Sequence, residues 1–306
     1  MKTKGEKKPL FGTLFSADDF GALGDDFSPL DSLRDGGFRS SPHGAKFLNR
    51  YDVDEMVRIL KKVGMVRQLA AKGYPDPVYD IFKDSQQIHY FRIFPDAKKD
   101  PSRVLVDLRL SEKRFIPDKL RVDAYRDMLF DMFAVEWLQT QNPDAAAFTA
   151  ERPQLPGQLR PGLGCLKYLL LMMKEVAPGI TIDGFLDVPD HFHLAVMYSR
   201  SFLFFDPVMQ GMVKAILRDT EGETLNDITW GAMTGTLIDR KSGEPFVYTP
   251  SNEMFPVSPR LNKYFSHRSY QRQAKDAFKG HKYVFDRTAM EKRRAEMLKK
   301  RDVSEL

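Results

Sequence analysis

Residues 161–179 read PGLGCLKYLLLMMKEVAPG, a glycine turn followed by an apolar run that predicts a helix. Gly162 and Gly164 carry no side chains that would keep a ligand away from the backbone. The first turn of a helix presents unpaired N–H groups and the positive end of the helix dipole, and both stabilise a phosphate. The turn therefore predicts a diphosphate site. The alternative is that Gly164 only lets this helix cross a neighbouring strand closely.

The expected diphosphate site includes the residues next to the glycines. Arg160 precedes the turn and would place a cation beside the outer phosphate oxygens. Cys165, the only cysteine of the chain, follows the turn where the helix begins. The residues expected to contact the diphosphate are Arg160, Gly162, Leu163, Gly164 and Cys165.

The segments around this turn have helical and extended patterns. Upstream, apolar spacing predicts helices over 53–72 and 119–140 and strands over 78–83, 88–94 and 103–110. Downstream, it predicts a strand over 180–188 and fits either helix or strand over 191–200. Further predicted elements are helices over 208–218, 224–233, 261–279 and 287–301, and strands over 235–238 and 245–248. This order predicts an α+β fold with a mixed, mainly antiparallel sheet flanked by helices.

Composition divides the chain into three parts. Residues 1–50 are rich in Gly, Ser and Asp with phenylalanines spaced through them, which predicts an irregular N-terminal arm that docks its aromatic side chains on the body. Residues 51–255 form the expected α+β body. Residues 256–306 are expected to be a helical C-terminal extension.

The net charge of +5 comes from the two ends of the chain. Residues 1–8 contribute +3 and residues 286–306 contribute +2, so the body between them sums to zero and has no excess of cations for a nucleic acid. A content of 42% hydrophobic residues is enough for a globular core, but no apolar run approaches the roughly 20 residues of a membrane span. A single cysteine excludes an internal disulfide. These features predict a soluble, cytoplasmic protein without nucleic-acid or membrane partners, and they leave the oligomeric state open.

The unit from 154 to 206 combines the glycine turn, an amphipathic helix, a strand, a segment with a tyrosine and an aromatic-rich strand. In this order it resembles the cofactor half of the GNAT superfamily of N-acetyltransferases. The resemblance implies an acyl-CoA N-acyltransferase-like fold. It also implies transfer of an acetyl or other acyl group from acetyl-CoA, the co-substrate, to the amine of a small molecule or peptide.

The resemblance also assigns roles to residues. The backbone amides of Gly162, Leu163 and Gly164 would bind the pyrophosphate of acetyl-CoA, and Tyr198 would protonate the departing thiolate. From the chemistry of the side chains, His193 is a candidate base because its ordinary pKa is about 6.5, and Asp187 is a second one.

Two other functions remain open from the sequence. Cys165 at a helix start, followed by His193 and Asp206, resembles the nucleophile, base and orienting residue of transglutaminase-like and papain-like thiol enzymes. That arrangement needs His193 on a strand, whereas acyl transfer needs a helix over 191–200. A non-enzymatic binding or structural protein would need neither arrangement. His191 and His193 could also share a metal with Asp187 or Asp190 nearby, but no other His-rich cluster supplies the remaining ligand, so no metal is expected.

Overall fold

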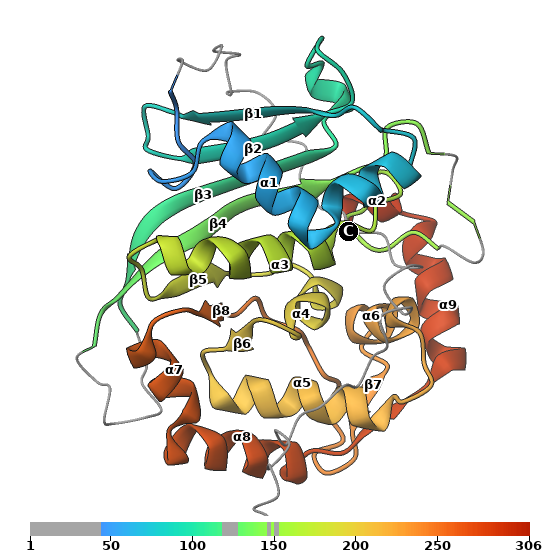
Figure 1. Cartoon of the computed structure of the whole chain (residues 1–306). Helices are drawn as coiled ribbons and strands as arrows, with labels where there is room; N and C mark the ends of the chain where they lie inside the picture. Colours follow the sequence, from blue (N-terminus) through green and yellow to red (C-terminus); the bar gives the residue numbers. More distant parts are fainter. Residues whose placement is uncertain (1–43, 118–127, 146–147, 150–152) are drawn as a thin grey trace, which may run out of the picture.

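The computed structural model of this chain describes residues 44–117, 128–145, 148–149 and 153–306. Most of the predicted N-terminal arm therefore lies outside the described residues. The described chain contains a seven-stranded sheet in the order β1-β2-β3-β4-β5-β8-β6 (Figure 1). The strands are β1 (Val78–Lys83), β2 (His89–Phe94), β3 (Val106–Phe115), β4 (Phe130–Thr140), β5 (Gly184–Asp187), β6 (Leu203–Phe204) and β8 (Glu253–Pro256). Every neighbouring pair is antiparallel except β4 and β5, which are parallel.

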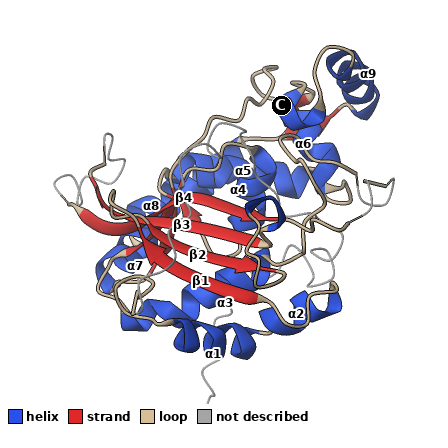
Figure 2. Ribbon diagram, turned by 90° about the horizontal axis from the view of Figure 1, so that it is seen from above, coloured by secondary structure: helices blue, strands red, loops and turns tan. Residues whose placement is uncertain are grey.

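Helices α1 (Val53–Val63), α2 (Met65–Ala71) and α3 (Leu166–Val176) lie on one face of strands β1 to β4 (Figure 2). A capping box starts α1, since the Asp52 carboxylate accepts from the Glu55 backbone and the Glu55 carboxylate accepts from the Asp52 backbone. Gly64 then adopts φ 91° and ends the helix. The single helix predicted over 53–72 is therefore two helices.

The chain continues after α3 with six more helices. They are α4 (Phe192–Tyr198), α5 (Pro207–Asp219), α6 (Leu225–Met233), α7 (Pro259–Ser266), α8 (Arg268–Gly280) and α9 (Arg287–Leu298). A separate ribbon pairs β7 (Leu237–Asp239) with β9 (Tyr283–Phe285). Single 3-10 turns span Pro101–Arg103, Ala177–Gly179 and Val303–Glu305. The predicted α+β class, with a mainly antiparallel sheet flanked by helices, is confirmed.

Two apolar clusters hold the sheet between its helices. The larger cluster joins α1, α2, α3, α4 and α5 to the sheet. The smaller cluster lies on the opposite face, where α7 and α8 cover strands β4, β5 and β8. Its members include Met132, Leu186, Met254, Leu261 and Tyr270. Because both faces of the sheet are covered here, four of the first five residues of β4 are buried, which hides the alternation that marks a strand in sequence.

The helix predicted over 119–140 is wrong in its described part, because residues 130–140 form strand β4. Leu129, Phe133 and Trp137 are four residues apart and suggest a helix. In the structure the register between β3 and β4 shifts between Arg109 and Leu110, so Glu136 is an extra residue on β4. Such a bulge breaks the period of two and leaves the helical spacing as the stronger signal. Residues 118–127 of the predicted helix lie outside the described residues.

Other elements differ from the sequence prediction mainly in their bounds. The predicted strand 180–188 is shortened to β5, and 245–248 forms only a single bridge, between Ile238 and Pro245. The helix predicted over 261–279 is divided at His267, whose backbone is extended. The helices predicted over 208–218, 224–233 and 287–301 are confirmed as α5, α6 and α9, the last ending at Leu298. The aromatic-rich strand expected at the end of the 154–206 unit is the two-residue strand β6, whereas the sequence does not predict β8 and β9.

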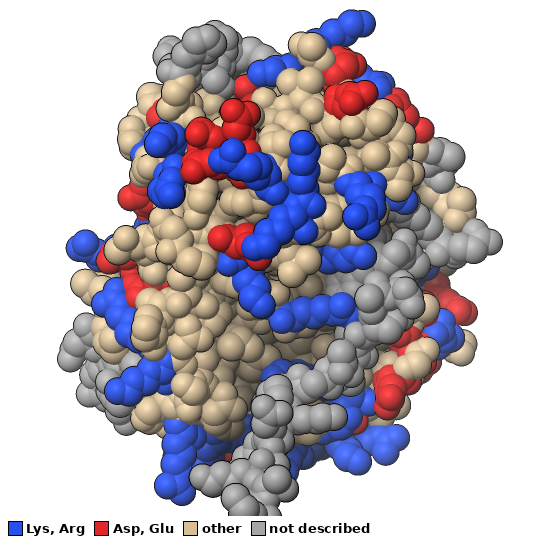
Figure 3. Space-filling model, in the orientation of Figure 1, with Lys and Arg blue, Asp and Glu red and all other residues tan. Residues whose placement is uncertain are grey.

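Lysine and arginine side chains spread over the face formed by α1 and α3, with carboxylates among them (Figure 3). One such pair is Lys62 with Glu175, whose Nζ and Oε2 atoms are 2.5 Å apart between α1 and α3. Among the described helices, none has the length and apolar character needed to cross a bilayer.

Candidate functional site

The parallel strands β4 and β5 separate after a short paired region. Three residue pairs join them, Met132 with Gly184, Phe133 with Phe185 and Ala134 with Leu186. Beyond Ala134, β4 continues to Thr140 along β3 only. The edge of residues 135–140 that faces away from β3 is therefore not bonded to β5. In open sheets, ligands bind at the carboxyl ends of parallel strands where their directions part.

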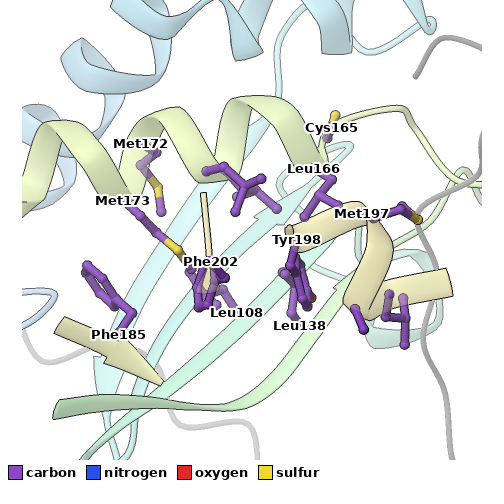
Figure 4. Packing of buried hydrophobic residues seen from close by; sticks show 14 of the residues in the cluster. Leu108, Leu138, Cys165, Leu166, Met172, Met173, Phe185, Met197, Tyr198 and Phe202 are labelled. Atoms are coloured by element: carbon purple, nitrogen blue, oxygen red, sulfur yellow. The ribbon is translucent and has the colours of Figure 1, made fainter. Parts of the chain in front are cut away.

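Helix α4 lies against the part of β4 that extends beyond its pairing with β5. The Tyr198 ring points from α4 toward the Leu138 side chain of β4 (Figure 4). It also contacts the Phe202 ring, with centroids 5.5 Å apart, and only 2% of Tyr198 is exposed. Residues 192–198 are helical, so the segment that sequence left open is resolved as a helix. The space beside the separating strands is filled by these apolar side chains.

The glycine turn lies at the start of α3, as expected, and its exposure varies along its length. Gly164 adopts φ 66° and is partly exposed, whereas Gly162 and Leu163 are buried. The Gln68 side chain of α2 donates to the Leu163 carbonyl at 2.7 Å, and its Nε2 would lie 3.3 Å from a Cβ at Gly164. A side chain at Gly164 would therefore meet the Gln68 amide and would also be strained by the positive φ. Arg160 is exposed next to the turn.

The residues of the predicted thiol triad are not joined by hydrogen bonds. His193 lies on α4 rather than on a strand, and neither of its ring nitrogens has a hydrogen-bond partner within the described part of the chain. Cys165 is fully buried, and its side chain points away from Tyr198 of α4 (Figure 4). The Asp206 carboxylate accepts from the Val208 backbone and caps α5. The structure therefore does not assemble a nucleophile, base and orienting residue from these three.

Burial also weakens His193 as a base. Its side chain is fully buried and stacks on His191, with ring centroids 5.4 Å apart. Removal from water, with a smaller effect of His191, holds the pKa of His193 well below its ordinary value. His193 is therefore neutral at pH 7 and accepts a proton poorly.

Two carboxyl groups meet at the point where β4 and β5 separate. Asp187, the last residue of β5, stands directly opposite Glu253, the first residue of β8. Side chains of directly opposed residues lie on the same face of a sheet, with Cβ atoms about 4.5–5.5 Å apart. This is the face of Phe185 and Phe255, which lie two residues away on each strand and pack into the larger cluster. The pair therefore faces the side of the sheet that α3 and α4 cover.

Glu253 has an unusual environment for a carboxyl group. It is fully buried, and both of its side-chain oxygens have no hydrogen-bond partner among the described residues. Asp187 is partly buried and accepts from the Val188 backbone at 2.9 Å. Desolvation, with a contribution from Asp190, raises the pKa of Asp187 to about 7. Burial and the neighbouring Asp187 raise the pKa of Glu253 well above its ordinary value.

Of this pair, the sequence predicts only Asp187 as a candidate site residue. Asp187 stands out at the end of a predicted strand, but Glu253 lies far away along the chain, in a strand that was not predicted. The available signal was the local pattern of residues 253–256, an acidic residue at the head of a short apolar run. That pattern alone does not show a buried charge. Only the pairing of β5 with β8 does.

Comparison of the chain with models of protein families, with curated proteins and with solved structures finds no match.

Proposed function

We propose that this protein transfers an acyl group from a coenzyme A thioester, such as acetyl-CoA, to an amine. The observation that carries the proposal is the unit β4–α3–β5: a glycine turn at the N-terminus of α3, between two parallel strands that pair for three residues and then separate. The following α4 and β6 occur in the order that the resemblance to N-acetyltransferases implies. The helical state of residues 192–198 also favours acyl transfer over the thiol enzyme.

The proposal gives each part of the site a task. The backbone amides of the glycine turn and the exposed Arg160 face the diphosphate, which carries the negative charge of the cofactor. The edge of residues 135–139, which does not pair with β5, offers backbone donors and acceptors to the amide groups of the pantetheine arm. Entry of this arm requires the apolar side chains beside Leu138 to move.

The chemistry then needs two proton transfers. The amine nitrogen attacks the thioester carbonyl carbon and the carbon–sulfur bond breaks. The ionised Asp187 takes the proton that the nitrogen loses, a role that suits a carboxyl group with a pKa of about 7. The Tyr198 hydroxyl protonates the thiolate as it leaves.

Coenzyme A should raise the melting temperature of the protein, and Gly164→Val should abolish that rise. A valine at this position would press against the Gln68 amide and add apolar atoms beside the backbone amides of the turn, where the diphosphate is proposed to bind. At a CoA concentration 100 times Kd, binding contributes about 2.7 kcal/mol to stability. The measurement is a thermal melt with and without CoA.

Gly222→Val is the matched control for this test. Gly222 also has a positive φ, 91°, but a Cβ placed there would have nothing within 4 Å, and the residue is remote from α3 in sequence. Both variants carry similar backbone strain, so only Gly164→Val should lose the response to CoA. If millimolar CoA leaves the melting temperature of the unmodified protein unchanged, the acyltransferase proposal is wrong.

Tyr198→Phe should lower turnover of acetyl-CoA about 100-fold while leaving CoA binding intact, because it removes only the proton donor. The measurement is the release of free thiol with a saturating amine, alongside the thermal response to CoA. Equal turnover in the variant would show that Tyr198 serves the apolar core and not the reaction.

A further inference from the structure

Within the described part of the chain, no ion pair with a cation balances the carboxyl pair Asp187 and Glu253. The charged groups that act on the pair are themselves acidic: Asp190 acts on Asp187, and Asp187 acts on Glu253. No ion pair involves either carboxyl group among the described residues. Leaving a buried hydrogen-bond acceptor without a partner costs about 1–3 kcal/mol, and more when the group is charged. Such a cost at the end of two separating strands points to a ligand that supplies the missing donors and the missing charge.

We propose that Asp187 and Glu253 bind the ammonium group of a primary alkylamine. Its identification as the acyl acceptor rests on the function proposed above, but the binding itself does not. An ammonium group carries three N–H donors and one positive charge. It can therefore donate to the unpartnered oxygens of Glu253 and to Asp187 together, and it offsets the repulsion between the two carboxylates.

The aromatic ring of Tyr248, close to the carboxyl pair, also suits an ammonium ligand. The Tyr248 ring lies 5.6 Å from the Phe192 ring of α4, and its hydroxyl donates to the Pro189 carbonyl at 2.8 Å. Asp187 and Glu253 are close enough to Tyr248 to add to the rise of its pKa that burial causes. Aromatic rings attract organic cations, so Tyr248 can add to the carboxyl pair without competing for the N–H donors of the ammonium group.

The charge of the pair also defines which amines are excluded. An amino acid brings its own carboxylate next to Asp187 and Glu253, and like charges in a desolvated site repel strongly. An alcohol of the same length lacks the positive charge. A metal ion is a poorer fit, because the described residues contain no group of three or more His, Cys, Asp or Glu side chains arranged to hold one.

The binding can be tested with n-butylamine as the probe, by calorimetry on the full chain at pH 8 without CoA. We expect butylamine to bind, and 1-butanol and 4-aminobutanoate to bind at least tenfold more weakly. Glu253→Gln keeps the shape of the side chain but removes its charge, so it should weaken butylamine about 10- to 100-fold. Glu244→Gln, which alters an exposed carboxylate, is the control and should bind as the unmodified protein does.

The pH dependence gives a second readout that needs no variant. At pH 5.5 both carboxyl groups hold protons more than at pH 8, so butylamine should bind more weakly there. Equal binding of butylamine and 1-butanol would overturn the proposal, even if Glu253→Gln failed to fold. The proposal would also be overturned if magnesium bound and butylamine, at the same concentration, did not.

The outcomes separate this proposal from the acyltransferase. If CoA raises the melting temperature but butylamine does not bind, the carboxyl pair is not an ammonium site and the acyltransferase proposal stands. If butylamine binds and CoA has no effect, the ammonium site stands and the acyltransferase proposal is wrong.

Discussion

Glu253→Gln should raise the melting temperature at pH 8, although it alters a fully buried residue. In the unmodified protein Glu253 has neither a hydrogen bond nor a counter-ion among the described residues, and burial raises its pKa well above the ordinary value. Glutamine has nearly the same volume and no charge, so it removes the cost of desolvating the charge. The glutamine amide still lacks partners, but it does not titrate, and each unit by which folding raises a pKa costs about 1.4 kcal/mol at high pH. We therefore expect a net gain of about 1–3 kcal/mol in the free energy of unfolding. For a chain of this size, that is a rise of several degrees.

The sign of the pH dependence follows from the direction of the pKa shifts. Burial raises the folded-state pKa of both Asp187 and Glu253, so the folded chain holds protons that the unfolded chain has already lost. The contribution of these two groups to stability is therefore greatest below the unfolded pKa, near 4, and is lost as the pH rises through about 7, where Asp187 ionises. Asp187 is partly exposed, so solvent reduces its contribution. In Glu253→Gln this decline should be shallower.

The experiment is a series of thermal melts between pH 5 and pH 8.5 for the unmodified protein, Glu253→Gln and the exposed control Glu244→Gln. The control should follow the unmodified protein. A lower melting temperature for Glu253→Gln at pH 8 would mean that its carboxylate has a stabilising partner, and would contradict both the unpartnered environment of Glu253 and the ammonium site derived from it.

A chain keeps such an unfavourable pair only where the pair has a use. Local rules of burial and pairing are satisfied in most of the core, and the places where they fail are concentrated at functional sites. Here Glu253 and His193 are two of the six described side chains that bury a nitrogen or oxygen without a hydrogen-bond partner, the others being His89, Arg92, Trp137 and Trp230. The cost in stability and the proposed function are therefore expected to be coupled: removing the charge should stabilise the fold and weaken the ligand.

Much of the local structure around α3 could be predicted from sequence. The glycine turn, the apolar helix after it and the short strand ending at Asp187 have patterns that local rules recognise. Strand β4 could not be predicted, because burial on both faces and the extra residue Glu136 remove its alternation. The separation of β4 from β5 depends on how strands pair, and no local pattern encodes it.

The carboxyl pair shows the same limit for the site. Asp187 and Glu253 become neighbours only because β8 inserts between β5 and β6, against the order of the chain. Sequence therefore ranked His193 as a base, since a histidine has a suitable pKa in water. Its actual pKa depends on its burial in α4, which sequence does not give.

Gly184→Ala should destabilise the protein by about 3 kcal/mol, the upper range for adding one methyl group to a filled core. Gly184 is the first residue of β5 and pairs with Met132 on one side and Pro256 on the other. A Cβ there would lie 2.3 Å from the Phe255 carbonyl oxygen and 2.9 Å from Cδ2 of Leu261. The Leu261 side chain could rotate, but the carbonyl belongs to β8 and moves only if β8 shifts.

That shift would reach the site, because β8 carries Glu253 and β5 carries Asp187. We therefore expect Gly184→Ala to lower the melting temperature and also to weaken butylamine at a temperature where the variant is still folded. Gly280→Ala is the control, since nothing lies within 4 Å of its added methyl group and alanine is favoured over glycine in a helix. A Gly184→Ala protein as stable as Gly280→Ala would show that β5 and β8 are not packed as closely as this register requires.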